Sequence, residues 1–112
     1  MNDRERAGVG LLGLGARAHR LAIGVDAARE ALRRGVAEAL VLARDASPRA
    51  RERLLALAMH RGVVVLKGPG ADELGRVLGR PPVHGAAVLD RQLARGLRAY
   101  LEAEDRGEKG TV

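Results

Sequence analysis

Apolar residues along the chain follow two periods, one typical of helices and one typical of buried strands. Between about Arg4 and Arg20 they recur three and four positions apart, at Leu11, Leu14 and Ala18, which predicts a helix that buries these side chains. Short continuous apolar runs are instead typical of strands inside a core. The four predicted strands span residues 21–23, 39–43, 63–67 and 86–90.

Four further helices are predicted by the same periodicity, and their ends carry the residue types that begin and end helices. Asp26, Ser47 and Asp90 are the expected N-caps, because short polar side chains accept hydrogen bonds from the first free N–H groups of a helix. Gly35 and Gly62 are expected to end two helices, because glycine adopts the left-handed conformation at little cost. The four helices are expected over residues 27–34, 48–61, 71–79 and 91–101.

Helices and strands alternate along the whole chain, and this order is typical of an α/β fold. We therefore expect helices on both faces of a small central sheet, with Ala27 and Tyr100 among the inward-facing residues. The 112 residues suit one domain. We expect a single α/β domain over residues 1–104 and a polar C-terminal tail over residues 105–112.

Three glycines near the start, Gly8, Gly10 and Gly13, have the G-x-G-x-x-G spacing of dinucleotide-binding loops. Such a loop needs a buried strand before it and an acidic residue about 20 positions further on. The preceding MNDRERA is short and charged, and the later REALRRG has the pattern of a helix that ends in a turn. We therefore expect the glycines inside the first helix, where they allow close packing, and we expect no cofactor.

The composition excludes several classes of site. Tyr100 is the only aromatic residue, which excludes recognition of bases by stacking on aromatic surfaces. The chain has no Cys and its three His are not spaced as metal ligands, so neither a disulfide nor a metal site is expected. The only serine, Ser47, is assigned to a helix cap, and no G-x-x-x-x-G-K-[ST] phosphate loop occurs. We expect no catalytic residues and no enzyme.

The net charge is +6, and nearly all of the basic residues are Arg. A surplus of this kind on a small domain favours a polyanionic partner, most often a nucleic acid. No apolar run is long enough to span a membrane, and the N-terminus has no apolar signal segment. We expect a cytoplasmic protein with no membrane partner.

Three stretches are candidates for a functional surface. In the first, Arg29 and Arg33 lie four positions apart beside Arg34, and the helix N-terminus after Gly24 offers free N–H groups. Together these groups suit contacts to phosphates. The alternative is a solvated polar helix face on which Glu30 offsets Arg34.

The second stretch surrounds the helix start at Ser47 and includes Arg44, Arg49, Arg51 and Arg53. It is either a ligand-facing edge of the sheet or simply a capped helix. The third stretch is RPPVHGAAV, residues 80–88, whose two prolines pre-set a loop before the last strand. His84 in this loop is either a contact to a base or an incidental loop residue.

Three separated segments, taken in order, resemble a known family. They are LLGLGARAHRLAIG, AREALRRGVAEALVLARDAS and VVVLKGPGADELGRVLGRP, and the similarity covers about residues 11–97. They resemble the kink-turn RNA-binding family of archaeal and eukaryotic large-subunit ribosomal proteins, most of all its small bacterial YlxQ-like members. The resemblance implies a three-layer α/β/α sandwich around a four-stranded mixed sheet, with RNA bound at one end.

In this family the motif Gly-x-Asn-Glu-x-x-Lys-x-x-x-Arg-Gly enters the widened groove of the kink-turn, and it corresponds to residues 24–35. The first glycine and the final Arg-Gly match, whereas Asp26, Ala27 and Glu30 replace Asn, Glu and Lys. Ionised Asp only accepts hydrogen bonds, whereas Asn also donates. A loop before the last strand covers a flipped-out base in the family. With the flanking arginines, the implied RNA-binding residues are Gly24, Val25, Asp26, Arg29, Arg33, Arg34, Arg44, Pro82, Val83, His84 and Gly85.

The residues and the resemblance together predict a non-enzymatic RNA-binding protein associated with the ribosome or with translation. Its partner would be a structured RNA, such as a kink-turn or a stem-loop, held through a helix N-terminus and Arg side chains. The alternative is a protein-interaction module of the same fold that has lost specific RNA recognition, as Asp26, Ala27 and Glu30 suggest. We expect the protein to be a monomer.

Overall fold

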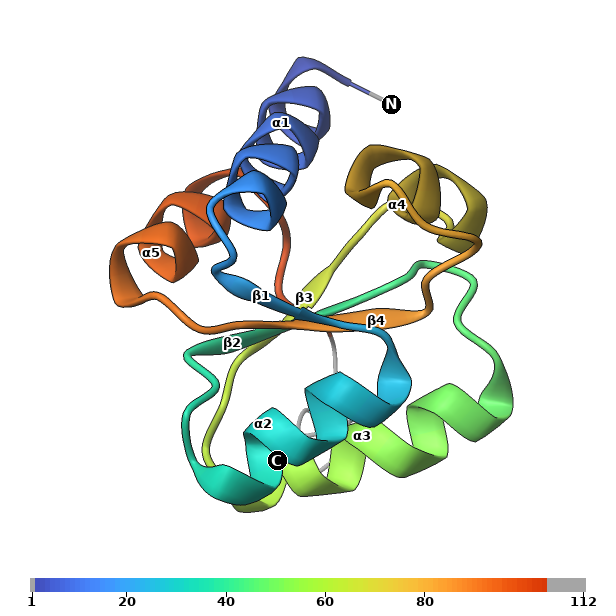
Figure 1. The fold of residues 1–112 in the computed structure, drawn as a ribbon, viewed down its shortest axis with the longest axis vertical. Coiled ribbons are helices and arrows are strands. Elements are labelled where there is room, and N and C mark those ends of the chain that lie inside the picture. The colour runs from blue at the N-terminus through green and yellow to red at the C-terminus, as the bar shows by residue number, and fades with distance from the viewer. Residues whose placement is uncertain (1, 105–112) are drawn as a thin grey trace, which may run out of the picture.

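The computed structural model describes residues 2–104, which form a three-layer sandwich (Figure 1). Helices α1, α4 and α5 cover one face of a central sheet, and helices α2 and α3 cover the other (Figure 1). The predicted α/β/α architecture is confirmed. The elements are α1 (Asp3–Arg17), β1 (Leu21–Ile23), α2 (Val25–Arg34), β2 (Ala39–Leu42), α3 (Pro48–His60), β3 (Val65–Lys67), α4 (Ala71–Leu78), β4 (Gly85–Val88) and α5 (Arg91–Tyr100).

The sheet has the strand order β1-β4-β2-β3. Strands β2 and β3 are parallel and are joined through α3, whereas β4 is antiparallel to both β1 and β2. The four-stranded sheet is therefore mixed, as predicted. Because β4 comes last in the sequence but lies between β1 and β2, it brings the loop before it to the middle of one end of the sheet.

The core is aliphatic, and small residues line the middle of the sheet. Every residue of β2 and β4 is buried, because helices cover both faces. Tyr100 is 39% exposed, so its predicted inward position is wrong, and Leu101 is the buried side chain at this end of α5. The fully buried leucines are Leu12, Leu32, Leu40, Leu42, Leu54, Leu66, Leu74 and Leu97.

The face of helix α1 that packs against neighbouring elements differs from the face that the apolar spacing predicts. Leu14 is 55% exposed, while Gly8 and Gly15 are buried. A Cβ at Gly8 would lie 2.8 Å from Leu101 Cδ2, and one at Gly15 would lie 2.6 Å from Leu93 Cδ2. The expected close packing at glycines is confirmed at these two positions but not at Gly10, where no atom lies within 4 Å of a Cβ.

The helix starts follow the predictions at two of three caps. The Ser47 hydroxyl accepts a hydrogen bond from Ala50 N (3.1 Å), and Asp90 Oδ1 accepts one from Leu93 N (2.9 Å). This bond from Leu93, reinforced by the nearby Arg20 guanidinium, holds the pKa of the Asp90 carboxyl below its ordinary value. The predicted cap at Asp26 is wrong, because α2 already begins at Val25, one residue before Asp26.

Gly24 is the actual N-cap of α2, with a φ of +100°, and Asp26 lies in the first turn of the helix. A positive φ of this size suits glycine and lets the chain turn directly from β1 into the helix. As a consequence Ala27 is exposed rather than part of the buried stripe. Ala28, Ala31 and Leu32 form that stripe, as predicted.

Residues 102–104 run antiparallel along the outer edge of β3. Lys67 N donates to Glu102 O (2.8 Å), and Glu104 N donates to Val65 O (2.6 Å). Ala103 forms a bridge with Leu66 between these two bonds. The predicted polar tail, residues 105–112, lies outside the described residues.

Candidate nucleic-acid interface

The topology brings three distant parts of the chain to one end of the sheet. Strands β1 and β2 both finish there, where Ile23 pairs with Ala86 and Leu42 pairs with Gly85. Helix α2 begins directly after β1, α3 begins shortly after β2, and the loop of residues 80–84 leads into β4. The starts of α2 and α3 and the loop before β4, each a part of one candidate stretch, therefore meet at this end.

The joint between β1 and α2 is tied to the first residue of β4. Gly24 N donates to Gly85 O across 2.9 Å. No side chain caps the N-terminus of α2. The unpaired N–H groups of the first turn therefore present the positive end of the helix dipole, which favours an anion.

His84 joins the loop before β4 to the start of α3. Its Nδ1 accepts a hydrogen bond from Ser47 N at 3.1 Å, and the side chain is half-buried. Because Nδ1 is the acceptor, the proton of the neutral ring resides on Nε2. The imidazole can therefore donate one hydrogen bond to a ligand.

Arg53 takes part in two of the contacts that connect α2 with α3. Arg53 Nη1 lies 2.5 Å from Asp26 Oδ1, and Arg29 Nη1 donates to Arg53 O across 3.0 Å. The Asp26 side chain is 88% exposed while that of Arg53 is 33% exposed. This exposed ion pair contributes little to stability, but it holds one guanidinium beside the start of α2.

These groups surround a hollow of about 180 Å³, which we call the α2–α3 hollow. Arg49 on its rim is exposed and has no ion pair within residues 2–104. Two guanidinium groups thus face one carboxylate, so the hollow carries a net positive charge. Its lining residues are Val25, Asp26, Ser47, Arg49, Ala50, Arg53 and His84.

The structure brings only part of the predicted site together. Val25, Asp26 and His84 line the hollow, next to Gly24. Arg33 and Arg34 lie at the opposite end of α2, about 12 Å along the helix from its first residue.

The charges on α2 are also paired differently from the prediction. Arg33 Nη1 lies 2.6 Å from Glu30 Oε1, so Glu30 offsets Arg33 rather than Arg34. Arg29 is half-buried and donates to the α3 backbone, so its guanidinium bridges two helices.

The loop before β4 divides into surface and core residues. Pro82 is exposed and His84 is half-buried. Val83 is 4% exposed, and its N–H donates to Ala71 O (3.0 Å). Gly85 is buried, and a Cβ there would lie 2.7 Å from Leu54 Cδ1. Val83 and Gly85 therefore belong to the core, whereas Arg80 and Pro81 at the start of the loop are exposed like Pro82.

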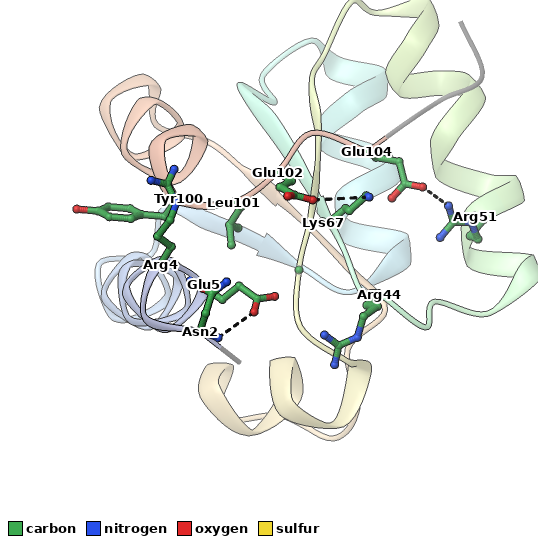
Figure 2. A pocket seen from close by; sticks show the side chains of 11 residues that line it. Asn2, Arg4, Glu5, Arg44, Arg51, Lys67, Tyr100, Leu101, Glu102 and Glu104 are labelled. Carbon is green, nitrogen blue, oxygen red and sulfur yellow. Dashed lines mark hydrogen bonds and ion pairs between the residues drawn. The ribbon is translucent and has the colours of Figure 1, made fainter. Parts of the chain in front are cut away.

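Arg44 lies apart from the α2–α3 hollow, at a larger hollow of about 550 Å³ (Figure 2). Arg51 pairs there with Glu104, Lys67 Nζ lies 3.9 Å from Glu102 Oε1, and Arg4 Nη2 donates to Ala99 O (2.6 Å). Two of its four cations pair with carboxylates, and its net charge of four cations and three carboxylates is no larger than that of the smaller α2–α3 hollow. Its charged lining residues are Arg4, Glu5, Arg44, Arg51, Lys67, Glu102 and Glu104.

For Arg49 and Arg53, the sequence left open whether they belong to a ligand-facing edge or simply to a capped helix. Their signal is their position, two and six residues after the Ser47 cap. The contact between Arg53 and Asp26, residues 27 positions apart, is what places them beside α2.

Two kinds of site are absent from residues 2–104. No three His, Asp or Glu side chains gather there as a metal site. No helix in this part of the chain is long and apolar enough to cross a membrane.

Comparisons with known proteins agree with this architecture. The model of the ribosomal protein L7Ae/L30e/S12e/Gadd45 family matches residues 7–98, which include the whole α2–α3 hollow. A solved structure of a protein with unknown function from Bacillus halodurans C is 28% identical, with a TM-score of 0.77, and the match covers 83% of this chain and 94% of that one.

A Giardia lamblia 15.5kD RNA binding protein has the same fold, with a TM-score of 0.74 at 22% identity. The match covers 89% of this chain and 87% of the Giardia chain. No curated protein sequence matches the chain significantly.

Proposed function

The chain belongs to the ribosomal protein L7Ae/L30e/S12e/Gadd45 family, and on that premise we propose that it binds a structured RNA at the α2–α3 hollow without catalysing a reaction. One observation carries the proposal. An uncapped helix N-terminus, two guanidinium groups and an imidazole donor meet in a single hollow. The Giardia lamblia protein of this fold is itself described as RNA-binding.

The groups around the hollow suit two kinds of contact with RNA, one to its phosphates and one to a base. Arg49, Arg53 and the N–H groups of α2 suit phosphate oxygens, which fix the position of an RNA without reading its sequence. Asp26 accepts hydrogen bonds and His84 Nε2 donates one, which suits the edge of an unstacked base. RNA with a bulge or internal loop offers such a base, whereas a regular duplex does not.

A kink-turn is the RNA that we propose first, because the motif of residues 24–35 keeps its glycines and its final arginine. Asp26 replaces the asparagine of the motif. Its ion pair with Arg53 offsets part of the repulsion between its carboxylate and the RNA phosphates. We also propose that the protein acts in the cytoplasm as a monomer in translation. The likeness to YlxQ-like members stays a prediction.

A second candidate function is a protein-interaction module that has lost specific RNA recognition. The observation that favours it is that both acidic residues of α2 form ion pairs. Asp26 pairs with Arg53 and Glu30 pairs with Arg33, and each pair reduces the positive charge that would attract RNA. Partners that stay bound to the protein after nuclease treatment would support this candidate. Loss of every partner with nuclease would exclude it.

The test of RNA binding is a salt titration with three RNAs: a kink-turn, a plain stem-loop and an unstructured strand. The variant Arg49→Gln with Arg53→Gln removes both guanidinium groups from the hollow. Each lost phosphate contact should flatten the log–log salt slope by about 0.7 to 0.9. Arg17→Gln with Arg76→Gln, on α1 and α4, removes the same charge elsewhere and serves as the matched control.

We expect the kink-turn to bind most tightly and the hollow variant, but not the control, to flatten the slope. Two results would contradict the proposal. One is that no RNA binds more tightly than a random duplex. The other is that both variants flatten the slope equally, which would indicate attraction to net charge alone.

A further inference from the structure

The exposed face of α5 carries three arginines in one row. Arg91, Arg95 and Arg98 lie four and three positions apart, so they fall on one side of the helix. All three are exposed, while Ala94 and Leu97 turn toward the core. We call these three residues the α5 arginine row.

Within Arg91–Tyr100 no carboxylate offsets this row, and the capping Asp90 pairs with Arg20 instead. Each of α1 to α4 contains at least one Asp or Glu, whereas the sequence of α5, RQLARGLRAY, contains none. Arg91 Nε lies 3.8 Å from Glu38 Oε1, which is a weak and exposed pairing. Within the described part of the chain, neither Arg95 nor Arg98 has an acidic partner.

The row lies across the sheet from the α2–α3 hollow. Helix α5 is in the layer with α1 and α4, whereas α2 and α3 form the opposite layer (Figure 1). One short RNA segment cannot lie along α5 and also enter the hollow. A ligand of the row is therefore either a separate molecule or a more distant part of the same one.

The geometry points to a second RNA contact: we infer that the α5 arginine row binds the sugar–phosphate backbone of an RNA duplex that extends from the site at the hollow. The inference rests on the proposed function, because it takes RNA as the partner. Seven helical residues span about 10 Å, while a nucleic-acid strand carries a phosphate about every 3.4 Å along its axis. Three guanidinium groups in a row can therefore each reach a different phosphate, and Arg is suited to bidentate contacts with phosphate.

The chemistry of the row favours a phosphate backbone over bases or a lipid surface. The row contains no aromatic side chain and no hollow, so it offers nothing to hold a base. Binding to a membrane surface needs an apolar face on the same helix to enter the lipid. Leu93 and Leu97 are instead packed against α1 and the core, and Leu93 Cδ2 lies in contact distance of the Gly15 position.

The experiment compares two RNAs that share one kink-turn and differ only in the length of their helical arms. The variant Arg91→Gln, Arg95→Gln and Arg98→Gln removes the row and keeps helix-forming side chains. The control Arg17→Gln, Lys67→Gln and Arg76→Gln removes the same charge from α1, β3 and α4. Circular dichroism and melting temperatures establish that each variant is folded.

We expect wild type to bind the long-armed RNA more tightly than the short-armed RNA, with a steeper salt slope. The row variant should lose this gain, a change in slope of up to about 2.7 for three duplex phosphates, and bind the short-armed RNA as wild type does. The control should keep the gain. A row variant that binds the long-armed RNA like wild type overturns the inference while leaving the proposed function intact.

If wild type binds neither RNA, the proposed function itself fails, and the inference fails with it. Vesicles that contain anionic phospholipid test the remaining source of phosphate. Binding to vesicles that depends on the row, with no effect of the row on RNA, would also overturn the inference.

Discussion

Ser47 N donates a hydrogen bond to His84 Nδ1 across 3.1 Å, joining residues 37 positions apart in the sequence. This bond fixes the ring of His84 at the rim of the α2–α3 hollow and leaves Nε2 for a ligand. One side chain thus both anchors the loop before β4 and offers a donor to RNA. The two roles can be separated by substitution.

His84→Ala should weaken RNA binding and lower the free energy of unfolding by about 0.5 to 1.5 kcal/mol, the range for one lost hydrogen bond. His84→Asn can still accept from Ser47 N through its carbonyl oxygen. It should restore the stability but not the full affinity, because it lacks the Nε2 donor. Urea denaturation and calorimetric titration measure the two effects. Wild-type affinity in the alanine variant would exclude His84 from the RNA site.

Asp26→Asn should strengthen the binding of kink-turn RNA. The substitution releases Arg53 from its ion pair and adds a hydrogen-bond donor at the α2 N-terminus. We expect the salt slope to steepen by less than about 0.9, the value for one whole phosphate contact, because Arg53 already faces the RNA and gains only the charge that Asp26 offsets. Asp72→Asn is the matched control, because Asp72 is the second residue of α4 as Asp26 is of α2. An equal gain in both variants would mean that net charge, not Arg53, is responsible.

Two glycines should respond in opposite directions to substitution by Ala. Gly10 lies inside α1 and faces open space, so Gly10→Ala should stabilise the protein by about 0.5 to 1 kcal/mol. A Cβ at Gly75 would lie 2.3 Å from Pro81 O, so Gly75→Ala should destabilise it by about 1 to 3 kcal/mol. Urea denaturation gives both values. Equal effects at the two positions would show that α4 does not approach Pro81 so closely.

The Asp90 cap should make stability depend on pH in the acid range. Hydrogen bonding from Leu93 N–H, together with Arg20, lowers the pKa of Asp90 in the folded protein. A lowered pKa means that the carboxylate stabilises the fold above the ordinary aspartate value of about 3.9. That contribution is lost as the pH falls through the lower, folded value.

Asp90→Ala should therefore melt below wild type at neutral pH, and the two melting temperatures should converge in acid. Asp90→Asn keeps an oxygen that can accept from Leu93 N but loses the charge. Its melting temperature at neutral pH should lie between those of wild type and Asp90→Ala. If the difference in melting temperature between wild type and Asp90→Ala stays constant with pH, the charge of Asp90 does not contribute to stability.

The sequence predicted the layers well because periodicity and caps are local properties. Ser47 and Asp90 act as caps as expected, since each needs only its own helix. The buried face of α1 was placed wrongly because spacing was counted on large apolar residues, and Leu14 fitted that count. The face is set instead by Gly8 and Gly15, whose lack of a side chain matters only once α5 is beside them.

The candidate site could be predicted only in part, for the same reason. Helical spacing indicates that Arg29 and Arg33 share a face, but it does not show which neighbour that face meets. Arg29 turned out to bond the backbone of Arg53, and Arg33 pairs within its own helix. The hollow exists because β4 inserts between β1 and β2, and such a strand order is not a local property of the sequence.

Residues 102–104 also influence how the molecule meets copies of itself. By bonding to Val65 and Lys67 they occupy the outer backbone groups of β3, which would otherwise be a free sheet edge. Free edges pair readily with other strands and seed aggregation. The opposite edge, β1, has three residues, the same length as β3, so each edge strand alone offers a short template. A chain cut back to Leu101 would keep the buried residues of its core and the α2–α3 hollow, and with the outer edge of β3 uncovered it should associate more readily at high concentration.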